Sequence, residues 1–242
     1  AGTRLESEIR QHVVVQYQLD EMWGVVRRHA SKVGVRLFGD LPFFVALESA
    51  DVWVHPELFT LDHARRPIDV AGVPPDYFSQ SGQMWSNPLY RWDAHLEQSF
   101  VWWRARVARL AELFDIVRID HFRAFDSCWA IPASASDASS GRWEAGPGEA
   151  LLAALVDEVG EILIAEDLGI IPNSVIELRR RFSIPGMVVL QFAFDDGIPT
   201  NPHLPQNHRF DSVCYTGTHD NDTTRGWYEE ALGSQTEHLR RR

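Results

Sequence analysis

The second half of the chain repeatedly places a short apolar run before a helix-like segment, and this alternation limits the folds that are open to it. The apolar runs have the length and composition of buried strands. Predicted strands cover 114–119, 161–169, 186–194 and 212–221, and predicted helices cover 150–160 and 173–182. Because strands that alternate with helices form a parallel sheet covered by helices, the sequence predicts an α/β fold.

The first half adds one strand and two helices to this prediction. A helix is expected over 15–30, where apolar residues recur at three- and four-residue steps. A β-rich run at 33–46, broken at Gly39 and Pro42, follows this helix. A second helix is expected over 96–110. With the β-rich run at 33–46, the predicted strands along the chain number five.

A long stretch rich in proline, glycine and aromatic residues, 48–92, separates this strand from the second helix. Such a long excursion between regular elements is usually a functional loop. The Ala- and Ser-rich run 132–141 has the composition of a linker, but ordered sequence resumes directly after it. We therefore expect a surface loop there and not a domain boundary.

Two α/β architectures, which differ in the number of strands that they need, are compatible with this pattern. A closed (β/α)₈ barrel needs eight strands, whereas an open doubly wound sheet can stop at five or six. The phosphate-binding pattern GxGxxG is absent after every predicted strand, which disfavours the open dinucleotide-binding sheet. The chain also lacks an initial Met and ends on a charged, helix-like run. We therefore expect residues 1–242 to be one catalytic segment of a partial TIM barrel, incomplete at both ends.

Composition excludes several classes of partner. With 23 Lys and Arg against 34 Asp and Glu, the formal charge is −11, so a nucleic acid backbone would be repelled. No apolar run is long enough to span a membrane, and the first residues have no apolar signal core. Cys128 and Cys214 lack ligand spacing and lie in apolar surroundings, which predicts buried, reduced thiols in a cytoplasmic protein without a metal site.

Three of the predicted strands end on a carboxylic acid. These acids are Asp120, Glu166 and Asp220, and they are separated by 46 and 54 residues. Each separation is long enough for a helix and a return strand, so the three side chains can converge at one end of a parallel sheet. In barrels of this class the carboxyl ends of the strands form the active face.

The neighbours of these acids suggest different protonation states. Arg118 lies two residues before Asp120, on the same side of the strand, where its cation would keep Asp120 ionised. Glu166 follows an apolar run, and partial desolvation would raise its pKa. One ionised and one protonated carboxyl group are what cleavage of a glycosidic bond requires, while His219 and Asp220 could bind sugar hydroxyls.

The aromatic stretch offers candidate sugar contacts. Aromatic side chains can stack on the apolar face of a sugar ring, and amides and carboxylates can bind its hydroxyls. The aromatic candidates are Tyr77, Phe78, Trp85 and Tyr90, and the polar candidates are Asp76, Gln83 and Asn87. The alternative is an aromatic cluster that simply packs over the rim of the barrel.

Other interpretations remain open at this point. Asp120 can cap the following helix, Asp167 fits a turn before Gly169, and His219 alone can be structural. Three strand-end acids could also hold Mg²⁺ in an enolase-like barrel, although Arg118 and His121 crowd Asp120. A third possibility is a noncatalytic, glucan-binding remnant of a barrel, since an unclosed sheet exposes hydrogen-bonding edges.

A series of motifs resembles one known family. They are, in order, GDLPFFVA, HPELF, AGVPPDYFSQSGQMWSNPLY, FDIVRIDHFRAF, WAIPA, GRWEAGPG, IAEDLG, IPGMVVLQFAF and YTGTHDNDTTRGW. They resemble segments of the 4-α-glucanotransferases of glycoside hydrolase family 77, also called amylomaltases or disproportionating enzymes. The resemblance spans nearly the whole chain, and it implies a barrel segment holding about strands 3 to 7, with the long stretch inserted after its first strand.

The resemblance also implies a reaction and roles for individual residues. Asp120 would be the nucleophile, Glu166 the acid/base and Asp220 the stabiliser of the transition state. Substrate-binding residues would be Arg118, His121, His219 and Asp40, together with the loop residues Asp76, Tyr77, Phe78, Gln83, Trp85 and Asn87 over the acceptor site. The expected reaction is retaining transfer between α-1,4-glucans or maltooligosaccharides, without a cofactor.

Overall fold

The computed structural model describes residues 2–75, 79–194 and 198–233. All five predicted strands are present, each shorter than expected. They are β1 (Phe38–Leu41), β4 (Ile116–Ile119), β7 (Leu163–Ala165), β8 (Gly186–Val189) and β9 (Ser212–Tyr215). β1, β4 and β7 form one parallel sheet in that order, and β8 pairs with β9 in another. The Ala165 amide donates to the Pro185 carbonyl at 2.8 Å, which joins β7 to the start of β8.

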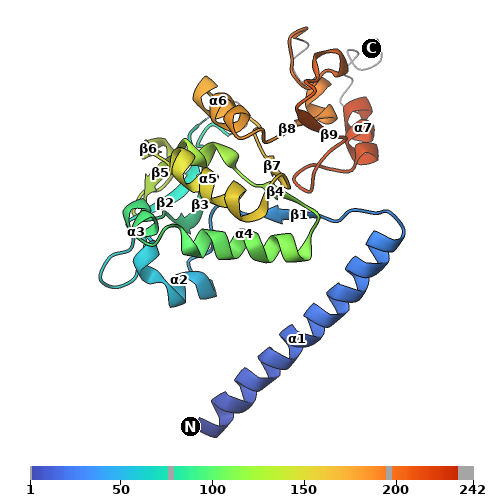
Figure 1. Ribbon diagram of the computed structural model, residues 1–242. Helices are drawn as coiled ribbons and strands as arrows, with labels where there is room; N and C mark the ends of the chain where they lie inside the picture. The colour runs from blue at the N-terminus through green and yellow to red at the C-terminus, as the bar shows by residue number, and fades with distance from the viewer. Residues whose placement is uncertain (1, 76–78, 195–197, 234–242) are drawn as a thin grey trace.

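Helices α4 (Val101–Leu113) and α5 (Gly148–Val159) pack together against the β1–β4–β7 sheet (Figure 1). Each helix buries one apolar face, and a salt bridge of 2.8 Å between Arg104 and Glu158 joins their outer sides. The faces they bury include Trp103 and Val107 of α4 and Leu151, Leu152 and Leu155 of α5. Helices α6 (Asn173–Arg181) and α7 (Thr224–Gly233) follow later in the chain. No described helix is long and apolar enough to cross a membrane.

A four-stranded antiparallel sheet was not predicted from the sequence. Its order is β3-β2-β5-β6. Its strands are β3 (Gln83–Pro88), β2 (Asp69–Val73), β5 (Ser127–Pro132) and β6 (Arg142–Ala145). The stretch 48–92 is therefore more regular than a loop, and it also contains α2 (Ala50–Val54) and the 3₁₀ turn Pro56–Leu58, while α3 (Trp92–Glu97) begins at its end. The run 132–141 joins β5 to β6 within this sheet, as expected for a loop inside one domain.

An aromatic cluster fills the space between the two kinds of sheet. Phe43 contacts the rings of Tyr90, Trp103 and Phe125, with centroids 5.1 to 5.9 Å apart. Tyr90 is 5% exposed, and its hydroxyl donates to the Phe43 carbonyl at 2.6 Å. The prediction that Tyr90 offers a platform to sugars is therefore wrong, because the packing of these distant segments buries its ring.

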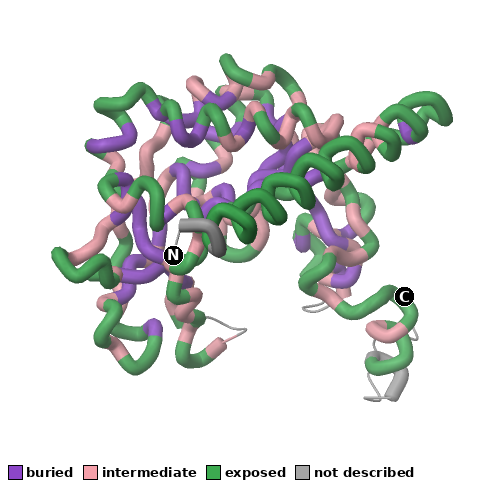
Figure 2. The backbone as a smooth tube through the Cα atoms, turned by 90° about the horizontal axis from the view of Figure 1, so that it is seen from below, coloured by how far each residue is buried: buried purple, intermediate pink, exposed green. Residues whose placement is uncertain are grey.

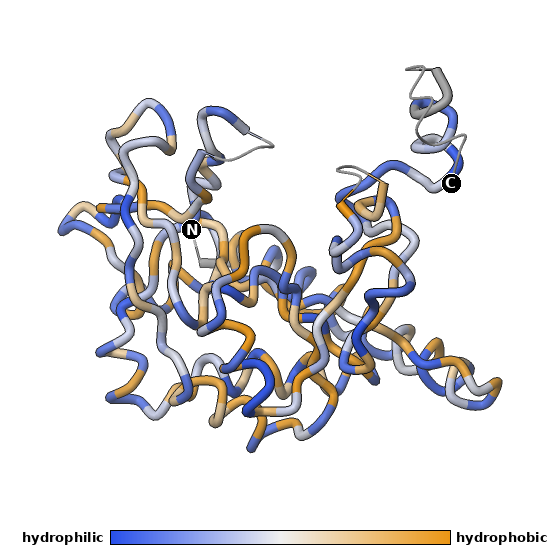
Figure 3. The backbone as a smooth tube through the Cα atoms, turned by 90° about the horizontal axis from the view of Figure 1, so that it is seen from above, coloured by the Kyte–Doolittle hydropathy of each residue, from blue (hydrophilic) through white to orange (hydrophobic). Residues whose placement is uncertain are grey.

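Helix α1 (Gly2–Lys32) extends the helix predicted over 15–30 in both directions. Its apolar stripe is exposed along nearly the whole length of the helix (Figure 2), and apolar and polar residues alternate along it (Figure 3). The helix is fastened near its carboxyl end, where the Trp23 indole donates to the Leu113 carbonyl at 2.9 Å and contacts Phe114. Cys128 is buried as expected, but Cys214 is exposed, so the prediction of two buried thiols is wrong for Cys214.

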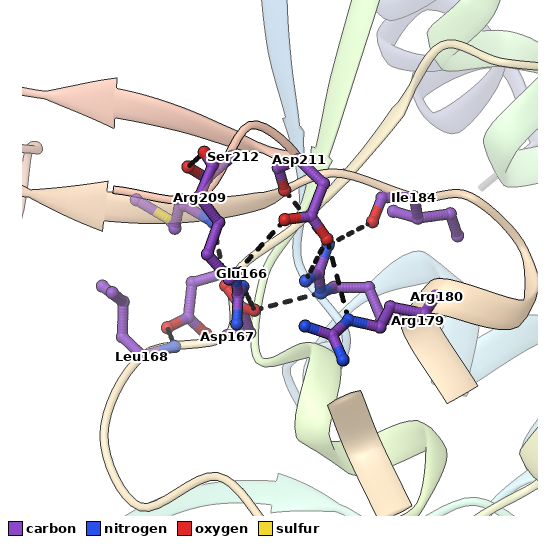
Figure 4. Close-up of polar contacts among 10 residues, drawn as sticks. Glu166, Asp167, Leu168, Arg179, Arg180, Ile184, Arg209, Asp211 and Ser212 are labelled. Atoms are coloured by element: carbon purple, nitrogen blue, oxygen red, sulfur yellow. Dashed lines mark hydrogen bonds and ion pairs between the residues drawn. The ribbon is translucent and has the colours of Figure 1, made fainter. Parts of the chain in front are cut away.

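A buried ion-pair network ties α6 to β7, β8 and β9 (Figure 4). Arg179 has no exposed side-chain surface, and it lies 3.2 Å from Asp167 and 2.9 Å from Asp211. Asp167 also accepts the Met187 amide of β8 at 2.8 Å. The interpretation of Asp167 as a turn residue is therefore wrong, because its side chain binds the Met187 amide of β8 directly and pairs with Arg179 of α6.

Replacing Arg179 by Met should lower the free energy of unfolding by about 3 to 5 kcal/mol, because Asp167 would keep a buried charge without its closest cation. Urea unfolding of the native full-length protein measures this loss. Arg180→Met is the matched control, since the adjacent Arg180 side chain is 57% exposed and should change the free energy by less than about 0.5 kcal/mol. Equal losses in the two variants would contradict the structural role of the network.

Candidate active site

The backbone brings two predicted catalytic acids to the same end of the parallel sheet. Asp120 directly follows β4, and Glu166 directly follows β7. The Asp120 amide donates to the Leu41 carbonyl at 3.0 Å, and the Glu166 amide donates to the Ile119 carbonyl at 2.9 Å. The ladder of backbone hydrogen bonds thus continues through both acids, which fixes them side by side on neighbouring strands.

Arg118 holds two carboxylates at this end of the sheet. Its side chain is 7% exposed, and it lies 2.7 Å from Asp40 and 2.9 Å from Asp120. Burial raises the pKa of Asp120 above its usual value, and the charges of Asp40 and Asp220 act in the same direction. Arg118 opposes this rise, so the expected contact is present and favours the ionised form of Asp120.

Glu166 is buried like Asp120, but it forms no ion pair in the described part of the chain. Burial, together with the negative charge of Asp120, raises the pKa of Glu166 to about 7. Its two carboxyl oxygens accept backbone amides, from His121 at 2.8 Å and from Leu168 at 3.1 Å, and the latter contact is drawn in Figure 4. The charge of Arg118 and these two amides oppose the rise, and the amides also fix the side chain. Glu166 is therefore a carboxyl group able to donate and accept a proton near neutral pH.

His121 connects the two acids to the antiparallel sheet. Its backbone is left-handed, with φ of 49°, a conformation that few non-glycine residues adopt. Burial lowers the pKa of its imidazole to about 4, and Arg123 acts in the same direction, so the ring is neutral. Its buried Nε2 has no hydrogen-bond partner in the described part of the protein. The edge-to-face contact with Trp85, at 4.9 Å, holds the ring in place.

Two cavities lie at this end of the parallel sheet, one lined by Glu166 and the other by the Asp40–Arg118 pair. The Glu166 cavity has a volume of about 320 Å³, and residues that line it include His121, Arg123, Trp143, Glu166 and Ile170. The Asp40 cavity has a volume of about 250 Å³, and residues that line it include Asp40, Arg118, Tyr215, Gly217 and His219. A larger cavity of about 630 Å³ lies between α1 and α4 and contains none of the three acids.

The remaining predicted residues lie at different distances from this centre. Asp220 and His219 lie beyond the end of β9, 3.4 Å from one another, with about two thirds of each side chain exposed. Asp220 is close enough to Asp120 for its charge to raise the pKa of that acid. The side-chain oxygen of Gln83 accepts a hydrogen bond from the Trp85 indole N–H at 3.1 Å. Asn87 lies on β3, whereas Asp76, Tyr77 and Phe78 lie outside the described residues.

Sequence reasoning missed Arg123 and Trp143, which line the Glu166 cavity. Both residues belong to motifs that resemble the family, FDIVRIDHFRAF and GRWEAGPG, but neither adjoins a strand-end acid. Within the described residues, no group of three or more His, Cys, Asp or Glu side chains could hold a metal ion.

Comparison with known proteins places this chain in a family. A family model described as 4-alpha-glucanotransferase matches residues 1–242. The chain belongs to the 4-alpha-glucanotransferase family. It is 51% identical over 234 residues to the 4-alpha-glucanotransferase of Thermus thermophilus, a match covering 96% of this chain and 47% of the relative. It is 47% identical over 218 residues to the chloroplastic/amyloplastic 4-alpha-glucanotransferase of Solanum tuberosum, covering 90% of this chain and 38% of that relative.

Two solved structures have a similar fold. The amylomaltase from Streptococcus agalactiae, solved in complex with acarbose, superposes with a TM-score of 0.87 at 37% identity, over 93% of this chain and 46% of the other. The fold also matches amylomaltase from Corynebacterium glutamicum, with a TM-score of 0.76 at 24% identity, over 90% of this chain and 32% of the other. The chain spans about half the length, or less, of these proteins.

Coupling between the two acids is testable by titration. Asp120→Asn should lower the pKa of Glu166 from about 7, by about 1 or more, because a negative charge that opposes ionisation is removed and Arg118 loses a competing partner. Carbon-13 NMR of labelled glutamate carboxyl groups measures the titration. Asp93→Asn, at a position 74% exposed, is the control and should leave it unchanged. An unchanged pKa in Asp120→Asn would show that the acids do not share a site.

Proposed function

We propose that the protein is a 4-alpha-glucanotransferase, which transfers a segment of an α-1,4-glucan to the 4-hydroxyl of an acceptor glucose or glucan. The observation that carries this proposal is the pair of acids at the ends of neighbouring strands. Arg118 stabilises the charge of Asp120, whereas the pKa of Glu166 is raised to about 7. A retaining glycoside transfer needs one group as a nucleophile and the other as an acid and then a base.

In the first step, the Asp120 carboxylate attacks the anomeric carbon of the donor glucan. The bond from this carbon to the glycosidic oxygen breaks, and its electron pair stays with the oxygen. Protonated Glu166 transfers its proton to that oxygen, so the departing glucan leaves as a neutral alcohol. The products are a glucosyl ester of Asp120, with inverted configuration, and an ionised Glu166.

In the second step, the Glu166 carboxylate takes the proton from the 4-hydroxyl of the acceptor. The acceptor oxygen attacks the anomeric carbon, and the ester bond to Asp120 breaks with its electron pair returning to the carboxylate. Two inversions give net retention, and both acids regain their starting protonation states. The pKa near 7 suits Glu166 for both directions of proton transfer.

The groups around Asp120 would bind the sugar that carries the reacting carbon. Asp40, Arg118 and His219 line the Asp40 cavity. Positive charge develops on the sugar in the transition state, and Asp220, whose charge acts on Asp120, would stabilise it. The neutral ring of His121 would accept or donate one hydrogen bond to a sugar hydroxyl.

We also propose a more specific fold and a class of partner molecules. The parallel strands would be about strands 3 to 7 of a (β/α)₈ barrel, with the region 48–92 lying over the acceptor site. The contact of Trp85 with His121 supports that position, and Asp76, Tyr77, Phe78, Gln83 and Asn87 would contribute from the same region. Partners would be α-1,4-glucans and maltooligosaccharides rather than nucleic acid or membrane. A cytoplasmic location fits its two unpaired cysteines, Cys128 and Cys214.

Incubation of the native full-length protein with maltotriose tests the function. We expect glucose together with longer maltooligosaccharides, because one maltosyl segment moves to a second maltotriose. Asp120→Asn should lower this rate by about a thousandfold or more, since the amide cannot form the ester. Chromatography of the products measures both rates.

Three results would contradict the proposal. Glucan binding without rearrangement would favour a noncatalytic remnant, and activity that a chelator abolishes would favour a magnesium enzyme. Full activity in Asp120→Asn would remove the nucleophile from its role. Asp126→Asn is the control and should retain activity, because Asp126 directly follows the 3₁₀ turn Phe122–Phe125 and lies outside the acid pair.

A further inference from the structure

The Glu166 cavity lies between two parts of the fold. His121 and Glu166 come from the ends of the parallel strands, whereas Trp143 comes from β6 of the antiparallel sheet. Its volume, about 320 Å³, is within the range of small-ligand sites. A ligand in this cavity would therefore contact the proposed acid/base on one side and the antiparallel sheet on the other.

Arg123 and Trp143 form the outer wall of this cavity. The Arg123 guanidinium carbon lies 3.7 Å from the centroid of the Trp143 ring, and the guanidinium also donates to the Ile170 carbonyl. Trp129 contacts the Trp143 ring at 5.1 Å. The indole is thus held in a defined orientation, while 41% of Trp143 stays exposed. A fixed, partly exposed indole presents apolar surface to a ligand without a further loss of side-chain freedom.

Two buried polar atoms of the lining residues lack partners. Neither the Nε2 of His121 nor the Nε of Arg123 has a hydrogen-bond partner in the part of the chain that the structure describes. Leaving a buried polar atom unpaired is costly, so such atoms indicate a missing partner. A hydroxyl group matches the hydrogen-bonding chemistry of both atoms, because it can accept from Arg123 and can either donate to or accept from a neutral imidazole. An aromatic wall with hydroxyl-binding groups is the chemistry of a sugar site.

The positions of the two acids determine on which side of the site the donor and acceptor sugars bind. Glu166 must reach the oxygen that leaves and the hydroxyl that enters, so the sugar bearing this oxygen lies on the side of Glu166. Glu166 lines the cavity that contains Trp143, whereas Asp40 and Arg118 line the other cavity. We propose that the Glu166 cavity binds the acceptor glucan and that Trp143, positioned by Arg123, determines acceptor affinity. This inference rests on the proposed transferase function.

A glycosyl fluoride separates the acceptor side from the donor side. With α-maltosyl fluoride as donor, Asp120 attacks the anomeric carbon and the carbon–fluorine bond breaks with its electron pair leaving as fluoride. No sugar needs to occupy the Glu166 cavity in this step. Fluoride release in a single turnover therefore reports the donor step. The steady-state rate of fluoride release, measured against maltotriose concentration at saturating donor, gives the KM for the acceptor.

In the native full-length protein, Trp143→Ala should raise the acceptor KM about tenfold, by loss of the aromatic contact, and change single-turnover fluoride release less than twofold. Trp143→Phe keeps an aromatic ring and should lie between the wild type and Trp143→Ala. Trp53→Ala is the matched control, since Trp53 is 75% exposed and lies outside this cavity. It should change neither quantity.

The possible outcomes are distinct. An unchanged acceptor KM in Trp143→Ala would overturn the inference while leaving the transferase function intact. Equal losses in both steps, in Trp143→Phe as well as Trp143→Ala, would also overturn it, because they indicate a structural role for the indole. No fluoride release by the wild-type protein, in one turnover or many, would instead contradict the proposed function itself.

Discussion

The contact of one buried guanidinium with two carboxylates organises the candidate active site of this protein. Arg118 and Asp40 are register partners on neighbouring strands, so the pairing of β1 with β4 sets their ion pair. The same guanidinium reaches Asp120 at 2.9 Å, two residues along its own strand. A charge as buried as Arg118 requires partners, and Asp120 is thereby confined beside β7. The position of Glu166 relative to Asp120 then follows from the register of β4 with β7.

The two acids differ because of their immediate partners. Asp120 has a cation at contact distance, which opposes the effect of burial. Glu166 has two backbone amides but no ion pair within the described chain, and its pKa rises to about 7. The two acids thus differ although both are buried, because Arg118 forms ion pairs with Asp40 and Asp120 and acts on Glu166 without an ion pair. The neutral imidazole of His121 preserves this asymmetry, because a charged ring would lower the pKa of Glu166.

Sequence patterns predicted the features that depend on the order of neighbouring residues. They failed for features that depend on packing between distant segments of the chain. The five parallel strands were predicted because each is a short apolar run, and Asp120 and Glu166 were found because they end two of these runs. Strand β6 (Arg142–Ala145) was missed because its residues are mainly exposed and carry no apolar pattern. Tyr90 has the composition of a loop aromatic, and only long-range contacts place it in the core. The cavity role of Trp143 depends on the same kind of contact, made with Arg123.

The central claim is that Asp120 forms a covalent bond to the sugar and that Glu166 exchanges the proton. Azide rescue with α-maltosyl fluoride tests both roles, because each variant should form a different anomer of maltosyl azide. In Glu166→Ala, azide should replace the acceptor and attack the ester, so two inversions give the α-azide. In Asp120→Gly, azide should enter the space of the missing carboxylate and displace fluoride once, which gives the β-azide. The same anomer from both variants, or the reverse assignment, would contradict the account.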